Sequence, residues 1–156
     1  MINLNNASNS AYQAALSTYN WSHACSGSNR LLIIGVSIFA TGTVTSITYN
    51  GVALTFLRAD AIGVYRSELW YLINPAEGTN TVEVNLSIAL TSIAGAVSYV
   101  GVDQLSPIGN NNGANGTNNP ATVDVTTVDS NSVVIDVLST SDTAITVGAD
   151  QNQRVN

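Results

Sequence analysis

Apolar and polar residues alternate along several short stretches of the chain. Val82, Val84 and Leu86 are separated by polar residues, and residues 121–127 follow the same pattern. Because successive side chains of a β-strand point to opposite faces, this alternation predicts strands with one buried and one solvated face. Clusters of Gly, Asn, Pro and Ser, which are typical of turns, divide these stretches. The predicted strands are about nine or ten in number and cover residues 12–23, 31–41, 44–49, 52–57, 63–73, 81–87, 93–102, 121–127, 132–139 and 144–147.

Two stretches are apolar on both faces. Residues 31–34 read Leu-Leu-Ile-Ile, and residues 132–138 are apolar at most positions. Strands buried on both sides have this composition, so these two are predicted either to lie centrally or to carry an interface. Asn50-Gly51 separates two alternating stretches and accepts the positive φ values of a type I′ turn, which predicts a β-hairpin over residues 44–57.

Helical periodicity is nearly absent, although residues 9–16 could form one or two helical turns. Residues 107–120 are mostly Asn and Gly between two prolines, which predicts a long loop. A chain of 156 residues fits one hydrophobic core. Residues 1–156 are therefore predicted to form a single all-β domain, an antiparallel β-sandwich whose many short strands follow one another closely.

Charged residues make up only 9% of the chain, against 45% hydrophobic residues, and the formal net charge is -6. There is no Lys, and the cations are Arg30, Arg58, Arg66 and Arg154. Nucleic acids and anionic membranes attract clustered cations, so neither is an expected partner. Without Lys the chain can form neither a Schiff base nor an isopeptide crosslink. Cys25 is the single cysteine, which excludes a disulfide within the chain.

The apolar pattern also argues against a secretory signal in the first residues and against a membrane-spanning segment. Residues 1–5 have neither the basic nor the apolar region of a secretory signal, so no signal is predicted there. The longest apolar stretch, residues 31–40, is interrupted by Gly35 and Ser37 and is too short to cross a bilayer, so membrane insertion is not expected.

Four motifs together resemble a known family. They are Trp-Ser-His at 21–23, Ser-Gly-Ser-Asn-Arg-Leu-Leu at 26–32, Ile-Thr-Tyr-Asn-Gly-Val-Ala-Leu at 47–54 and Leu-Trp-Tyr-Leu-Ile-Asn-Pro at 69–75. From about residue 12 onward the chain resembles β-sandwich modules of large bacterial surface or secreted proteins and of phage-associated proteins. The resemblance implies a jelly-roll-like, non-catalytic sandwich, and it brings no catalytic residues with it.

The end of the chain departs from this family. Modules of this kind continue beyond the position of residues 154–156 into further strands that close the sandwich. The edge of the sandwich could therefore be incomplete, in which case a strand from a neighbouring copy could fill it by β-strand addition. The alternatives are that the closing strand lies within the 156 residues or that the chain is truncated.

Several polar residues raise the question of catalysis. Trp21, His23 and Cys25 share one strand face, but residues two apart on a strand stand roughly 6.5 to 7 Å apart, too far for a catalytic dyad. A semi-buried structural His and a small buried Cys are the expected outcome. Glu68 and Glu83 have no fixed separation that would suit glycoside hydrolysis. Glu68 is instead expected to form a solvent-facing ion pair with Arg66.

Ligand binding is the other candidate chemistry. Aromatic and amide side chains bind sugars by stacking and hydrogen bonding, and the candidate ligand-facing residues are Trp70, Tyr71, Tyr99, Asn112 and Asn115. The competing interpretation places these aromatic residues in the core. Asp103, Asp142 and Asp150 lie near predicted turns and could offer oxygens to calcium, but no calcium-loop spacing is present. No cofactor is therefore predicted, with calcium as the alternative.

The sequence thus predicts a structural subunit or module of an extracellular, cell-surface or virion-surface assembly, not an enzyme. Its expected partners are other copies of itself, because a surface poor in charge packs closely without desolvating many ions. The alternative is a carbohydrate-binding adhesion module that recognises surface glycans.

Overall fold

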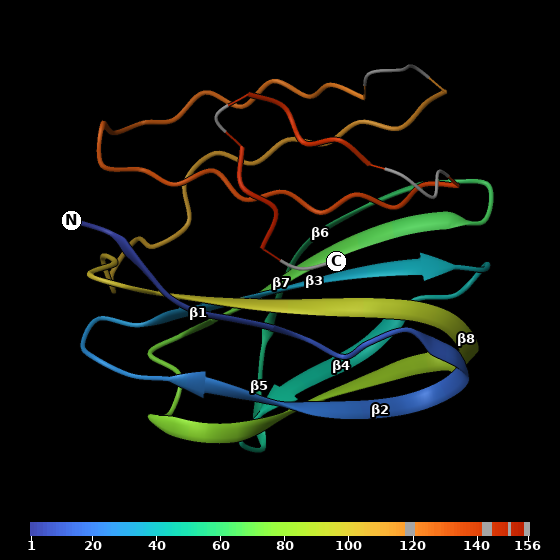
Figure 1. The fold of residues 1–156 in the computed structure, drawn as a ribbon, viewed down its shortest axis with the longest axis horizontal. Coiled ribbons are helices and arrows are strands. Elements are labelled where there is room, and N and C mark those ends of the chain that lie inside the picture. Colours follow the sequence, from blue (N-terminus) through green and yellow to red (C-terminus); the bar gives the residue numbers. More distant parts are fainter. Residues whose placement is uncertain (118–120, 142–144, 150, 155–156) are drawn as a thin grey trace.

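The computed structural model describes residues 1–117, 121–141, 145–149 and 151–154 (Figure 1). These residues are all-β and include no helix. The strands are β1 (Asn3–Asn9), β2 (Gln13–Cys25), β3 (Leu31–Phe39), β4 (Val44–Tyr49), β5 (Val52–Ala53), β6 (Thr55–Ile62), β7 (Tyr65–Ile73) and β8 (Gly78–Val100).

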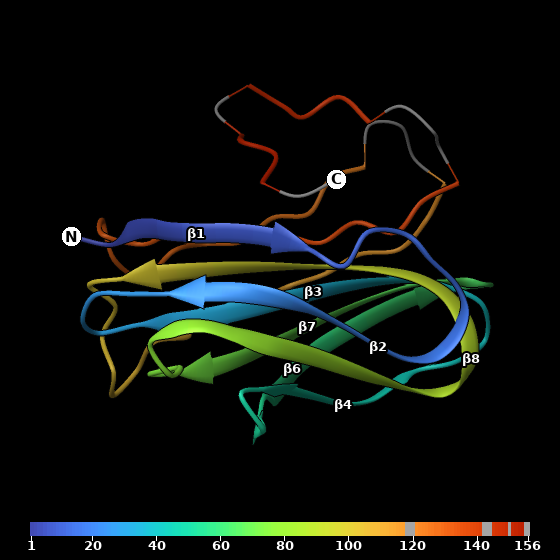
Figure 2. The same ribbon diagram turned by 60° about the horizontal axis from the view of Figure 1, so that its bottom comes forward.

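The strands form one antiparallel sheet organised around the long strand β8. The sheet order is β5-β4-β8-β3-β7-β6, and β1 and β2 also pair with β8. The first half of β8 pairs with β2 and β4, and its second half pairs with β1 and β3. Because β8 bends between these halves, the sheet curls over itself and is nearly closed, like a barrel (Figures 1 and 2).

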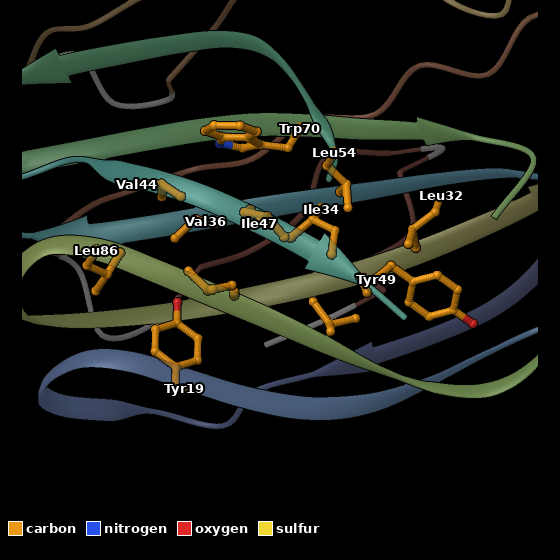
Figure 3. Packing of buried hydrophobic residues seen from close by; sticks show 14 of the residues in the cluster. Tyr19, Leu32, Ile34, Val36, Val44, Ile47, Tyr49, Leu54, Trp70 and Leu86 are labelled. Atoms are coloured by element: carbon orange, nitrogen blue, oxygen red, sulfur yellow. The ribbon is translucent and has the colours of Figure 1, made fainter. Parts of the chain in front are cut away.

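The main hydrophobic core fills the inside of the curled sheet (Figure 3). Ile34, Val36 and Ile38 of β3 point into it and are fully buried, as are Ile47 and Tyr49 of β4. Their alternation with residues on the other face gives the strands their period of two. Packing of these side chains is the main source of stability that a chain with few charges and no disulfide can use.

The outer face of β3, β7 and β8 carries a second, smaller core. Leu31, Ile33, Val97, Tyr99 and Val102 are buried there. Residues 103–117 and 121–139 lie over this face and cover it (Figures 1 and 2). The strand at residues 31–34 is thus buried on both faces, which confirms its predicted central position.

The predicted hairpin is confirmed. Asn50 and Gly51 have φ values of 50° and 75°, the positive sign that a type I′ turn requires at both positions. Tyr49 pairs with Val52 beyond the turn. The strand predicted over 52–57 divides at Leu54, whose buried side chain enters the main core, and the chain continues as β6 on the other side of the curled sheet.

Two predictions about the elements were wrong, and one strand was missed. Residues 9–16 form no helical turn, because they end β1 and begin β2. The strands predicted at 81–87 and 93–102 are one continuous strand, β8, since no Gly-Pro turn interrupts residues 88–92. Strand β1 was not predicted, because its polar sequence Asn-Leu-Asn-Asn-Ala-Ser-Asn has no apolar alternation.

The C-terminal predictions also differ from the structure. Residues 121–127 and 132–139 were predicted to be strands, but neither stretch pairs in a ladder with other described residues. The strand predicted at 144–147 begins outside the described residues, and residues 145–147 are not in a strand. The structure assigns eight strands among the described residues.

Candidate ligand pocket and buried polar clusters

A cavity of about 180 Å³ lies between the outer face of the sheet and the residues that cover it. The sheet side of the cavity is formed by Ile33 of β3, Leu69 and Tyr71 of β7 and Tyr99 of β8. These side chains point outward because they alternate with the residues that fill the main core. The covering side comprises residues 107–112, 125, 127, 128 and 132–135. The cavity is therefore lined mainly by apolar and aromatic side chains.

The polar rim of this cavity is held together by side-chain amides. Asn110 and Asn112 donate from Nδ2 to the backbone carbonyls of Thr126 and Asp124, each at 3.0 Å. Arg58 of β6 donates from Nη1 to Asn111 Oδ1 at 3.1 Å and forms an ion pair with Asp60 at 2.9 Å. The Asn-rich loop, residues 107–117, thus fastens residues 124–126 to the rest of the protein without a backbone ladder.

The five predicted ligand-facing residues do not form one site. Tyr71, Tyr99 and Asn112 line the cavity. Trp70 instead faces the main core, is 9% exposed and packs edge-on against Phe56. Asn115 is exposed and does not line the cavity. The alternation of residues 70 and 71 could have separated these two aromatics, because neighbours on a strand face opposite sides.

Glu68 contradicts its predicted solvent-facing position. Its carboxylate is 1% exposed and accepts three hydrogen bonds inside the curled sheet. Oε1 accepts from Arg66 Nε at 2.6 Å and from the backbone N–H of Val44 at 3.1 Å, and Oε2 accepts from Trp70 Nε1 at 3.0 Å. The inward residues of β7 therefore include Glu68 as well as Trp70 and Leu72. The carboxylate can be buried because its three donors replace the hydrogen bonds that it would make to water.

A second buried polar cluster surrounds the single histidine. His23 is 1% exposed, with Nδ1 2.7 Å from Ser8 Oγ of β1 and Nε2 3.0 Å from Ser98 Oγ of β8. Trp21 Nε1 donates to Ser8 Oγ at 3.0 Å, and Ser98 Oγ donates to Asn5 Oδ1 at 3.2 Å. These directions fit a neutral imidazole that donates from Nε2 and accepts at Nδ1. Burial lowers the pKa of His23 to about 4.

The predicted burial of Cys25 is confirmed, and His23 is more deeply buried than predicted. The Cys25 side chain is 1% exposed, and burial raises the pKa of its thiol. The sequence did not reveal that Ser8, Ser98 and Asn5 belong to the cluster around His23, because nothing in a sequence indicates which residues a small polar side chain will contact. Ser8 and His23 have the spacing of a nucleophile and a base. However, the chain of hydrogen bonds ends at an amide, and Ser8 lines neither described cavity.

The described residues contain no group of three or more His, Cys, Asp or Glu side chains that could hold a metal ion. Of the residues considered for calcium, Asp142 and Asp150 lie outside the described residues. Within the part of the chain that the structure describes, no helix is suited to crossing a membrane.

Searches with the chain against protein-family models, curated proteins and solved structures gave no match.

Proposed function

We propose that the chain is a non-enzymatic structural module that associates with copies of itself through its C-terminal segment, defined as residues 121–139. One observation carries this proposal. The segment has the composition of β-strands and lies along the sheet, yet it has no backbone ladder with the described residues.

The shape of the segment supports pairing with another chain. Residues 121–127 and 132–139 form two arms that run in opposite directions and are joined by a turn at 128–131 (Figure 1). The described backbone–backbone hydrogen bonds of turns and loops include none from residues 121–139. The carbonyls of Asp124 and Thr126 accept from side-chain amides, but neither arm belongs to a ladder of the described residues. Backbone groups of an extended arm outside a ladder can pair with a strand of a second molecule.

The side chains of the segment support the same conclusion. Val137 packs toward Gly35 of β3, where an added Cβ would lie 3.1 Å from its side chain, and Ile135 packs on the second core. Other apolar residues of the segment stay accessible to solvent, with Val128 73% exposed and Val134 60% exposed. A second copy that covered these residues would remove apolar surface from water, at about 25 cal/mol per Å² buried.

Self-association would also complete the fold expected from the sequence. Pairing of the two arms as strands would extend the eight strands of the sheet to the nine or ten of a jelly-roll-like sandwich. The scarcity of charged residues favours close packing between copies. Such a module would suit an extracellular, cell-surface or virion-surface assembly.

Carbohydrate binding, the alternative, has less support. Stacking on a sugar requires an accessible aromatic face, but Trp70 belongs to the main core and Tyr99 is 8% exposed. The cavity that Tyr71 and Tyr99 share is small and mostly apolar, whereas sugar sites offer many polar groups.

Light scattering coupled to size-exclusion chromatography over a range of protein concentrations tests self-association. The natural chain should form oligomers that dissociate on dilution. Val134→Asp should weaken them by placing a charge within the contact. Val52→Asp is the matched control, because Val52 is 53% exposed on β5, outside the segment. A natural chain that stays monomeric at high concentration would rule out the proposal.

A further inference from the structure

Strand β1 is held at the edge of the sheet by contacts that another copy could reproduce. It pairs with β8 from Asn3 opposite Val100 to Asn9 opposite Gly95, and β8 is its one ladder partner among the described strands. Its side chains contribute little to the main core; Ile2, just before β1, and Ala7 pack against the second core. The apolar anchoring of β1 is therefore weak.

Polar side chains provide the remaining attachment of β1. Ser8 hydrogen-bonds to His23, as described above, and Asn6 Nδ2 donates to the carbonyl of Ala24 at 3.2 Å. Asn5 exchanges two hydrogen bonds with Ser26, at 2.8 and 3.0 Å. These bonds join β1 to β2, and they break together if β1 leaves its place.

The connection between β1 and β2 is short and strained. Ala11 in this connection and Ala15 near the start of β2 have φ values of 57° and 53°, in the left-handed region that residues with a Cβ rarely adopt. The pairing of β2 with β8 is also irregular between Gln13 and Thr18. A short hinge under strain favours the exchange of the element that it connects, because an open hinge can relax.

We propose that β1 is an exchangeable strand: β1 of one copy leaves its own β8 and pairs with β8 of a second copy, with the Ser8–His23–Ser98 cluster as the latch. A second copy is the expected partner at the place on β8 that β1 leaves, because its β1 offers the same backbone ladder and the same side chains. This inference deepens the proposed self-association but uses a different element from the C-terminal segment.

The latch makes the exchange sensitive to acid. The groups that β1 and β8 turn toward His23 are the hydroxyls of Ser8 and Ser98, and Ser98 in turn donates to the amide oxygen of Asn5. The titratable neighbours are Tyr49 of β4, whose ring lies 6.4 Å away, and Cys25 of β2 itself. Neither supplies a negative charge to a protonated imidazole at mildly acidic pH, so protonation favours the state in which β1 has left and water reaches the ring.

Cysteine crosslinking between copies tests the exchange. Ala7 of β1 is opposite Val97 of β8, so Ala7→Cys and Val97→Cys are placed on separate copies, each also carrying Cys25→Ser. The copies are mixed at pH 8 or pH 5.5, returned to pH 8 and oxidised. A covalent heterodimer should form. It arises from the state in which β1 has left its own β8, and the population of that state should be about tenfold larger at pH 5.5 than at pH 8. This factor follows from a His23 pKa near 4 with β1 in place and near 6.5 after β1 has left. A mixture of Ala7→Cys and Val52→Cys copies controls for random collision.

Each outcome decides the proposal. Absence of a covalent heterodimer at both pH values overturns the exchange, as does an equal yield in the control mixture. Ser8→Ala, which keeps the ladder, should raise the yield at pH 8; an unchanged yield overturns the latch. Adding Val134→Asp to both copies separates this inference from the proposed function, because the exchange should persist when association through the C-terminal segment is lost.

Discussion

Arg66 and Glu68 lie two residues apart on β7, with Arg66 Nε 2.6 Å from Glu68 Oε1 and the carboxylate 1% exposed. The guanidinium of Arg66 is partly exposed to solvent, whereas the carboxylate of Glu68 lies inside the curled sheet. The carboxylate also accepts hydrogen bonds from the backbone N–H of Val44 and from the indole N–H of Trp70. One acidic residue thus links β7 to β4, two strands on opposite sides of the main core.

Replacing Glu68 by Gln should destabilise the protein by about 2–4 kcal/mol. The amide keeps the shape of the carboxylate but has one acceptor oxygen for three donors, and it cannot neutralise Arg66. Urea unfolding followed by tryptophan fluorescence measures the change.

The Arg58–Asp60 pair is a matched control for Glu68→Gln. It has the same spacing on β6, and the Asp60 side chain is 24% exposed. Asp60→Asn should cost under about 1 kcal/mol, as is usual for surface ion pairs. Equal losses for the two variants would show that burial of Glu68 does not determine its contribution.

Stability should fall on mild acidification because of His23. Burial lowers its pKa in the folded protein to about 4, whereas an unfolded histidine titrates near 6.5. The stabilisation is therefore complete above pH 6.5 and is lost as the pH falls toward 4. Between pH 8 and pH 5.5 the free energy of unfolding should drop by about 1.4 kcal/mol.

His23 is the single histidine, so comparison of the natural chain with a His23→Asn variant isolates its contribution. Urea unfolding of the natural chain and of His23→Asn at both pH values measures the effect. If the free energy of unfolding of His23→Asn falls by the same amount between pH 8 and pH 5.5, the pH dependence belongs to another group.

The Cys25 thiol should be unreactive in the folded protein. It is 1% exposed, and burial raises its pKa, so both access and the thiolate population are reduced. With Ellman's reagent at pH 8, the Val52→Cys variant should show one fast thiol and one slow thiol. Two fast thiols would place Cys25 at the surface.

Relief of strain in the hinge should stabilise the monomer. Ala11→Gly and Ala15→Gly place glycine where φ is 57° and 53°. Each should raise the free energy of unfolding by about 0.5–1 kcal/mol, the strain relieved exceeding the added entropy of the unfolded chain. Ala14→Gly, in the same stretch but with no positive φ, is the control and should destabilise the protein.

The pattern of the sequence predicted most of the sheet. Strands with apolar alternation or a turn dipeptide, such as the hairpin at Asn50-Gly51, were found because local chemistry determines them. Strand β1 was missed because a ladder on β8 and polar contacts with β2 hold its polar residues, and these partners lie far away in the sequence. Burial of Glu68 could not be predicted for the same reason, since its donors come from Val44 as well as from its own strand.

The candidate site was predicted only in part. Tyr71, Tyr99 and Asn112 meet at one cavity, but the tertiary placement of residues 107–139 creates it, and no local pattern reveals that placement. The alternating apolar residues at 121–127 predicted a strand that the structure does not form. Their ladder is absent within the described chain, which is the basis of the proposed association.

Amide hydrogen exchange of residues 121–139 at low and high protein concentration tests that association most directly. If the arms pair with another copy, their amides should exchange rapidly in the dilute monomer and become protected as oligomers form, while β3 and β8 stay protected throughout. Amides in the segment that exchange rapidly in both the monomer and the oligomer would contradict the account.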